Sequence, residues 1–156
     1  MSATPPVRIR PTDDPPSACP LVGRWRIARS VRDHRRGENA TFAGWATIGA
    51  DPAASGQLLW HEEGELVSGA HRGAAHRTMR IVPAGDAWEV RFADGRPFHS
   101  LDLAGGACTV VHLCSPDRYD GAFILRTADD LTVRWRVHGP AKGLEIVSDY
   151  RRAPDG

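Results

Sequence analysis

The sequence lacks any apolar run near the roughly 18 residues that cross a bilayer as a helix, and its first residues hold no apolar segment of a secretion signal. A formal net charge of only +1 argues against nucleic acid or a membrane surface as a partner. Two of its three cysteines, Cys108 and Cys114, stand about 20 Å apart on one predicted strand, which is too far for a disulfide. We therefore expect reduced thiols and a cytoplasmic location. We also expect a monomer or a homodimer.

Lysine is almost absent as well. Of the 20 lysine and arginine residues, Lys142 is the one lysine and the other 19 are arginine. Together with abundant alanine and glycine, this bias is typical of a GC-rich bacterial genome. We therefore attribute the arginines first to codon usage and only then to recognition. The length of 156 residues predicts one domain with a core of its own.

Motifs of the common catalytic and cofactor sites are missing. The chain has no glycine-rich phosphate loop between a strand and a helix, and no Gly-x-Ser-x-Gly nucleophile elbow. It also has no CxxC pair and no HxxxH pair, so no spacing is diagnostic of a zinc site. These absences argue against nucleotide binding by the common route and against a serine hydrolase, and we predict no cofactor and no metal.

What the sequence does contain is the alternation of apolar and polar residues that β-strands show. Turn signals such as Asp94-Gly95 separate the alternating segments. The pattern favours an all-β fold, a single antiparallel up-and-down barrel over residues 19–156, after a disordered proline-rich tail over residues 1–18. About ten strands are predicted, over 21–31, 41–48, 57–66, 75–82, 87–93, 97–103, 107–115, 119–127, 131–137 and 144–151.

The two ends of this barrel carry a matching signature. Gly23-x-Trp25 opens the first strand, and Arg151-Arg152 ends the last. In this respect the chain resembles lipocalins and related calycins. The resemblance implies a lipocalin-like barrel in which Trp25 plugs the floor and an arginine of the last strand packs over the indole ring as a cation–π cap. We expect a structural role for both ends.

Two polar motifs stand out between these ends. They are Asp94-Gly95-Arg96-Pro97-Phe98-His99 and His112-x-Cys114-x-x-Asp117-x-Tyr119. Together with segments 58–64, 135–142 and 150–152, they resemble DUF6314, a bacterial family of unknown function, over residues 21 to 152. The resemblance implies a small lipocalin-like barrel without an established family-wide activity, and it gives no catalytic residue to carry over.

The second motif supplies the predicted catalytic residues. His112 and Cys114 share one face of a strand, because residues two apart point the same way. Asp117 and Tyr119 follow at the rim of that strand, where either one can fix the tautomer of His112 as a general base. The alternative is a buried histidine satisfied by a backbone carbonyl, with Cys114 as a small apolar residue rather than part of a ligand site.

His99 in the first motif is a predicted ligand-binding residue. Simple alternation puts His99 and Leu101 on one face of their strand and Phe98 on the other. If His99 points inward, it faces His112 from a neighbouring strand, and the two can share a proton, bind a metal or flank a substrate. The alternative is a half-exposed histidine bonded to a turn.

A third candidate site lies on other strands. Trp60 is apolar and marks an inward face, so Glu62 on the same face is an inward carboxylate that needs a cationic partner. Arg77 on the following strand is the available partner. This pair is either a structural ion pair or the polar end of a ligand pocket, and Tyr150 is either a core aromatic or a pocket-lining donor.

The predicted function is binding of a small organic molecule inside the barrel, with acid–base catalysis of the cyclase or isomerase type in bacterial secondary metabolism built on that binding. The alternative is a non-catalytic carrier or sensor, since no recognised catalytic motif exists. A minor alternative is a haem- or metal-binding barrel with His112 or His99 as the ligand.

Overall fold

The computed structural model describes residues 19–154, so the tail predicted over residues 1–18 lies outside the described part. This part contains no helix that is long and apolar enough to cross a membrane. It is built from ten strands, β1 (Gly23–Asp33), β2 (Glu38–Ala50), β3 (Leu58–Ser68), β4 (His71–Ala84), β5 (Ala87–Phe92), β6 (Pro97–Leu101), β7 (Ala107–Cys114), β8 (Asp117–Thr127), β9 (Asp130–His138) and β10 (Gly143–Arg152).

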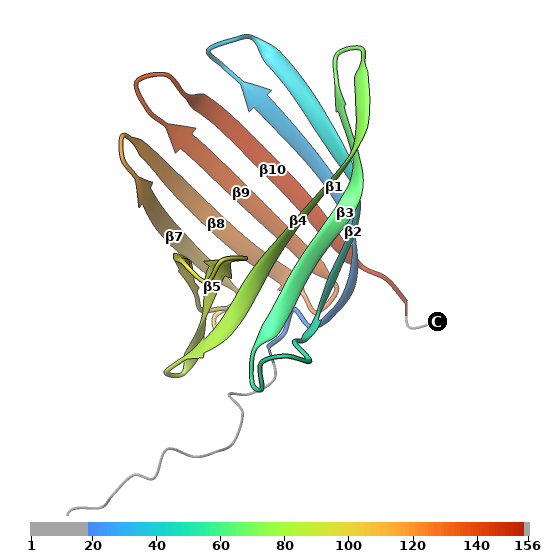
Figure 1. Cartoon of the computed structure of the whole chain (residues 1–156), viewed down its shortest axis with the longest axis vertical. Helices are drawn as coiled ribbons and strands as arrows, with labels where there is room; N and C mark the ends of the chain where they lie inside the picture. The colour runs from blue at the N-terminus through green and yellow to red at the C-terminus, as the bar shows by residue number, and fades with distance from the viewer. Residues whose placement is uncertain (1–18, 155–156) are drawn as a thin grey trace, which may run out of the picture.

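All ten strands form one antiparallel sheet that curls into a nearly closed barrel (Figure 1). The strand order is β6-β5-β4-β3-β2-β1-β10-β9-β8-β7, so sequence neighbours are hydrogen-bonded everywhere except between β6 and β7. The first and last strands pair with each other, from Trp25 opposite Arg152 to Asp33 opposite Leu144. The prediction of an all-β, up-and-down barrel is therefore confirmed.

The barrel has a seam where β6 meets β7, because no backbone ladder joins these two strands within residues 19–154. Side chains hold the seam. His112 on β7 donates a hydrogen bond from Nδ1 to the backbone oxygen of Phe98 on β6, at 2.9 Å. The His112 ring also meets the edges of Phe98 and Phe92, at centroid distances of 5.0 and 5.5 Å. A small aromatic cluster thus replaces the missing ladder.

A β-bulge prepares β6 for these contacts. Two consecutive residues of β5 pair with His99 and Pro97, so Phe98 is an extra residue with no partner of its own. The alternation rule, which put Phe98 on the opposite face from His99, is wrong here. The Phe98 ring stacks on Trp135 at 5.1 Å, and His99 meets the same indole at 5.3 Å. The bulge therefore directs two consecutive side chains at the barrel core.

The hairpin between β3 and β4 is longer than the sequence predicts. The predicted strands end at residue 66 and resume at residue 75, but the connection is only a two-residue turn, because β3 runs to Ser68 and β4 begins at His71. Gly69 takes a left-handed φ of +61° in this turn, which a two-residue hairpin loop favours. The first residues of β4 are all solvent-exposed, so no apolar alternation marks them in the sequence.

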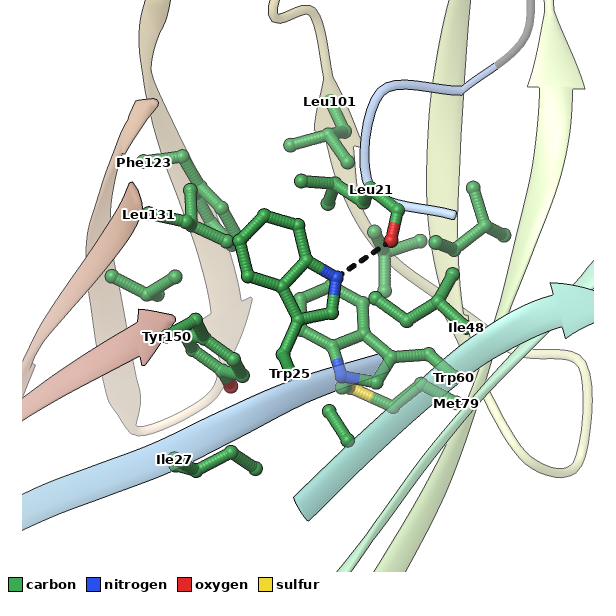
Figure 2. Close-up of a cluster of buried hydrophobic side chains, with 14 of the residues drawn as sticks. Leu21, Trp25, Ile27, Ile48, Trp60, Met79, Leu101, Phe123, Leu131 and Tyr150 are labelled. Carbon is green, nitrogen blue, oxygen red and sulfur yellow. Dashed lines mark hydrogen bonds between the residues drawn. The ribbon is translucent and has the colours of Figure 1, made fainter. Parts of the chain in front are cut away.

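The floor of the barrel is an apolar cluster around Trp25, which is 0% exposed. Figure 2 shows its indole Nε1 donating to the backbone oxygen of Leu21, at 2.9 Å. The Cζ atom of Arg152 lies 4.2 Å from the centre of the indole ring, as expected for an arginine of the last strand. A Cβ on Gly23 would lie 2.3 Å from Arg152 Nη1, so this cap requires glycine there. Other cluster members include Ile27, Ile48, Trp60, Met79, Leu101, Phe123, Leu131 and Tyr150.

Candidate functional site

A layer of polar side chains lies directly beyond the apolar floor. Alternation places it, because the inward residue that follows Ile27 on β1 is Arg29, and the one that follows Trp60 on β3 is Glu62. Arg77 on β4 pairs with Glu62 in register. Ser148 and Tyr150 on β10 complete the layer, both of them buried.

Glu62 is the centre of this layer and is 0% exposed. Its Oε1 accepts hydrogen bonds from Arg29 Nη2 at 2.9 Å and from Arg77 Nε at 2.7 Å. Its Oε2 accepts from Trp60 Nε1 at 3.0 Å and from the Tyr150 hydroxyl at 2.5 Å. The carboxylate thus accepts four hydrogen bonds, which fill its acceptor sites. A buried charge is tolerated when its hydrogen bonds are satisfied in this way. The expected Glu62–Arg77 pair is confirmed.

The surroundings of Glu62 keep it ionised. Burial alone raises its pKa, but the charges of Arg77 and Arg29 and the hydrogen bonds from Tyr150 and Arg77 outweigh burial and hold the pKa at about 2. Burial and the Glu62 charge together raise the pKa of Tyr150 well above its usual value of 10.0. Glu62 therefore stays ionised and Tyr150 stays protonated near neutral pH. The two side chains can hold a neighbouring group in place, but they do not exchange protons in that range.

The charges of this layer do not cancel. Two guanidinium groups face one carboxylate, so the described layer carries a net charge of +1. Arg29 is mostly buried, with 11% of its side chain exposed, whereas 44% of the Arg77 side chain is exposed. Arg29 is held further by bonds to the Ser148 hydroxyl at 2.7 Å and to the Tyr150 hydroxyl at 2.9 Å. Arg77 is the more accessible of the two cations.

A cavity of about 160 Å³ borders the two arginines. Ala75 on β4, which pairs with Gly64 on β3, is a small residue in its lining. The walls are apolar and the inner end is charged. The lining residues are Arg29, Val31, Phe42, Glu62, Leu66, Ala75, His76 and Arg77.

Arg29 is the site residue that sequence reasoning missed. Its signal was present, because Trp25, Ile27 and Val31 mark the inward face of the strand, and Arg29 falls on that face. Because the chain has 19 arginines, an arginine at this position did not stand out from the others in the sequence. The four predicted members Trp60, Glu62, Arg77 and Tyr150, by comparison, do come together in one cluster.

The predicted catalytic histidine lies at the seam, not in this layer. Because a carbonyl oxygen only accepts, the His112–Phe98 bond places a proton on Nδ1, so that in the neutral ring Nε2 is the acceptor. The group that fixes the tautomer of His112 is therefore a backbone carbonyl. This is the alternative named above, and it takes the role that was predicted for Asp117 or Tyr119. The Tyr119 ring lies beside His112, with centroids 5.7 Å apart. Catalysis at His112 stays a prediction.

The other residues of that motif lie at the end of the β7–β8 hairpin. Asp117 forms an ion pair with Lys142, whose Nζ lies 3.0 Å from Asp117 Oδ2. Cys114 is exposed at the same end of the hairpin, and its role in ligand binding stays a prediction. Within residues 19–154, no group of three or more histidine, cysteine or acidic side chains is arranged to hold a metal ion.

His99 is a core residue in this structure. It is 6% exposed, its Nδ1 donates to the Ser100 backbone oxygen at 2.8 Å, and its ring packs on Phe98, Phe123 and Trp135. The expected inward direction is confirmed. The Phe98 ring contacts both His99 and His112, at 4.8 and 5.0 Å, so an aromatic side chain adjoins each histidine.

We expect the burial of His99 to make stability depend on pH. Burial outweighs the bond to Ser100 and lowers the pKa of His99 from 6.5 to about 4. The unfolded chain therefore binds a proton that the folded chain does not, and stability falls as the pH drops from 6.5 to 4. The shift corresponds to about 3 kcal/mol. Urea unfolding of wild type and His99→Phe at pH 6.5 and 4.5 measures this difference.

The control for this experiment is His71→Gln, at an exposed position on β4. It should show the same pH dependence as the wild type, whereas His99→Phe should lose most of it over this pH range. Equal pH dependence in His99→Phe and wild type would show that another group is responsible.

Comparisons with known proteins agree with this architecture. The sequence model of DUF6314, a family of unknown function, matches residues 21–152. A search of curated proteins finds no match. Among solved structures, the S-type phycobiliprotein lyase CPES from Guillardia theta superposes with a TM-score of 0.64 and 10% identity, over 88% of this chain and 90% of that one.

A second similar structure is a protein of unknown function from the DUF3598 family of Nostoc punctiforme. It superposes with a TM-score of 0.58 and 15% identity. The match covers 86% of this chain but only 48% of that protein, so the chain spans about half its length. At these identities, both likenesses concern the fold alone.

Proposed function

The chain belongs to the DUF6314 family, a family of unknown function, and we propose that it binds a small organic molecule inside its barrel. The observation that carries this proposal is the buried ionic layer at the inner end of an apolar cavity. A barrel interior that serves stability alone is better filled with apolar side chains, because buried ion pairs add little net stability over well-packed apolar residues. A cavity with apolar walls and a few convergent polar groups is typical of a ligand site.

Binding is favoured over catalysis at this site. Glu62 is held ionised and Tyr150 is held protonated, so neither has the pKa of a general acid or base near neutral pH. The carrier or sensor alternative is therefore the one that the polar layer supports. Acid–base catalysis by His112, Asp117 and Tyr119 stays a prediction, as does a role in biosynthesis. The fold itself leaves both open, since one solved barrel of this shape is a phycobiliprotein lyase.

Small neutral probes test the proposal. We expect indole and benzyl alcohol to bind with a Kd on the order of 1 mM, as fragments of about this size do in partly apolar sites. Ligand-detected NMR on the full chain measures the binding. The variant Ala75→Trp should abolish it, because Ala75 lines the cavity and an indole ring at this position fills the space that the probe needs.

The matched control is Ala74→Trp. Ala74 is the preceding residue on β4 and is exposed on the outer face, where it pairs with Glu65. It should leave probe binding unchanged. Absence of binding in the wild type, or equal binding in Ala75→Trp and wild type, would contradict the proposal.

A further inference from the structure

We propose that the ligand of this barrel is a monocarboxylic acid with a ring-sized apolar body, and that its carboxylate binds the guanidinium of Arg77 beside Arg29. This inference rests on the proposed function, since it names the chemical class of the molecule that the cavity takes. It is carried by three observations: the unbalanced charge of the polar layer, the unused donors of Arg77, and the size of the cavity.

The unbalanced charge calls for an anion. Glu62 is the one acidic group within 4.0 Å of either Arg29 or Arg77 among the described residues. The neighbouring acidic residues of β3, Glu63 and Glu65, are exposed on the outer face, and Glu65 pairs with Arg72 there. A ligand with one negative charge brings the layer to neutrality, whereas a dianion leaves a net negative charge in a mostly buried place.

Arg77 has donors to offer to that anion. The described residues engage its guanidinium through a single hydrogen bond, from Nε to Glu62 at 2.7 Å. No hydrogen bond of its terminal nitrogens is found among the described residues, and Arg77 lines the cavity. A guanidinium there can donate two parallel bonds to a carboxylate. Glu62 already accepts four hydrogen bonds, so none of its acceptor sites is left for a cationic group of a ligand. These donors also weaken the repulsion between Glu62 and a ligand carboxylate.

The cavity defines the rest of the ligand. A dry cavity of about 150 Å³ lined by apolar side chains holds a benzene ring, and this cavity measures about 160 Å³. Phe42 and Leu66 form part of its wall. The Phe42 ring already packs against Arg29, with the Cζ atom of Arg29 5.1 Å from the ring centre, so an aromatic surface adjoins the cationic end.

Benzoate and benzamide test the inference, because they share one shape and differ in charge. We expect the wild type to bind benzoate at least about tenfold more tightly than benzamide, given the strength of charge-assisted bidentate bonds. In Arg77→Gln this ratio should fall to about one. Titration of the full chain at pH 7, followed by ligand-detected NMR, gives both affinities.

A matched control is Arg72→Gln, which removes an arginine of the same strand on the outer face. It should retain the tenfold ratio. The circular dichroism spectrum and the melting temperature establish that Arg77→Gln is folded, and Arg77→Lys, which keeps the charge but loses the fork, should show an intermediate ratio.

The outcomes separate this inference from the proposed function. If benzoate and benzamide bind wild type equally, and Ala75→Trp blocks both, the barrel binds small molecules but the carboxylate preference is wrong. If neither compound binds wild type but indole does, the inference is wrong and the proposed function stands; if indole does not bind either, both are wrong. If the ratio persists in Arg77→Gln, the anion binds elsewhere and the assignment of Arg77 fails.

Discussion

Replacing Glu62 with glutamine should lower the free energy of unfolding by about 3–5 kcal/mol at pH 7, the usual cost of removing one partner from a buried ion pair. The side chain keeps its shape, but Arg29 and Arg77 lose their shared counter-charge. The amide also turns one acceptor oxygen into a donor, which then opposes the donors from Trp60 and Tyr150 or those from the arginines. Urea unfolding followed by tryptophan fluorescence measures the loss.

The matched control is Glu65→Gln, on the same strand but exposed on the outer face, where its ion pair with Arg72 is worth less than about 1 kcal/mol. The contribution of Glu62 also has a defined pH range. Because its folded pKa of about 2 lies below its ordinary value of 4.5, the contribution is present above pH 4.5 and is lost as the pH falls toward 2. A loss below about 1 kcal/mol in Glu62→Gln would show that the layer tolerates an excess of positive charge.

Replacing Trp25 with alanine should be equally severe, with a loss of about 3–5 kcal/mol. The indole is fully buried at the barrel floor, so its removal leaves a large cavity there. The substitution also removes the hydrogen bond to Leu21 and the ring that Arg152 covers. Thermal and urea unfolding of the full chain measure the change in stability.

Trp45 provides a control of the same residue type. It lies on the outer face between two arginines, with the Cζ atoms of Arg24 and Arg26 at 4.0 and 4.8 Å from its ring centre. Such exposed cation–π contacts contribute about 0.5–1 kcal/mol each, so Trp45→Ala should cost far less than Trp25→Ala. Equal losses in the two variants would mean that the floor is no more important than the surface.

The fold was predictable because the barrel separates inside from outside on every strand. Where one face of a strand is buried, every second residue is therefore apolar, as with Leu131, Val133 and Trp135 on β9. The same rule failed at the open end of β4, where both faces meet solvent and the residues from His71 to Ala74 are all exposed. Alternation therefore predicts strands only as far as the core extends.

The candidate site was predictable in part for a similar reason. Glu62 was recognisable because a carboxylate two residues from an inward Trp60 demands a partner, and Arg77 was the available one. The inward direction of Phe98 was not recognisable, because a bulge is set by the pairing of β5 with β6 and not by the residues of β6 alone. The seam is also a property of the closed sheet, so His112 showed its chemistry in the sequence but not its position.

The place of the seam has a consequence for how the chain folds. Nine ladders join the ten strands, and eight of them connect strands that follow each other in sequence. The ninth, between β1 and β10, must bring together residues as far apart as Trp25 and Arg152. A circular permutant opened between β6 and β7 and joined across the natural ends would run from one seam strand to the other, with every ladder local. Since local pairing speeds folding, the natural order makes the β1–β10 closure the slow topological step.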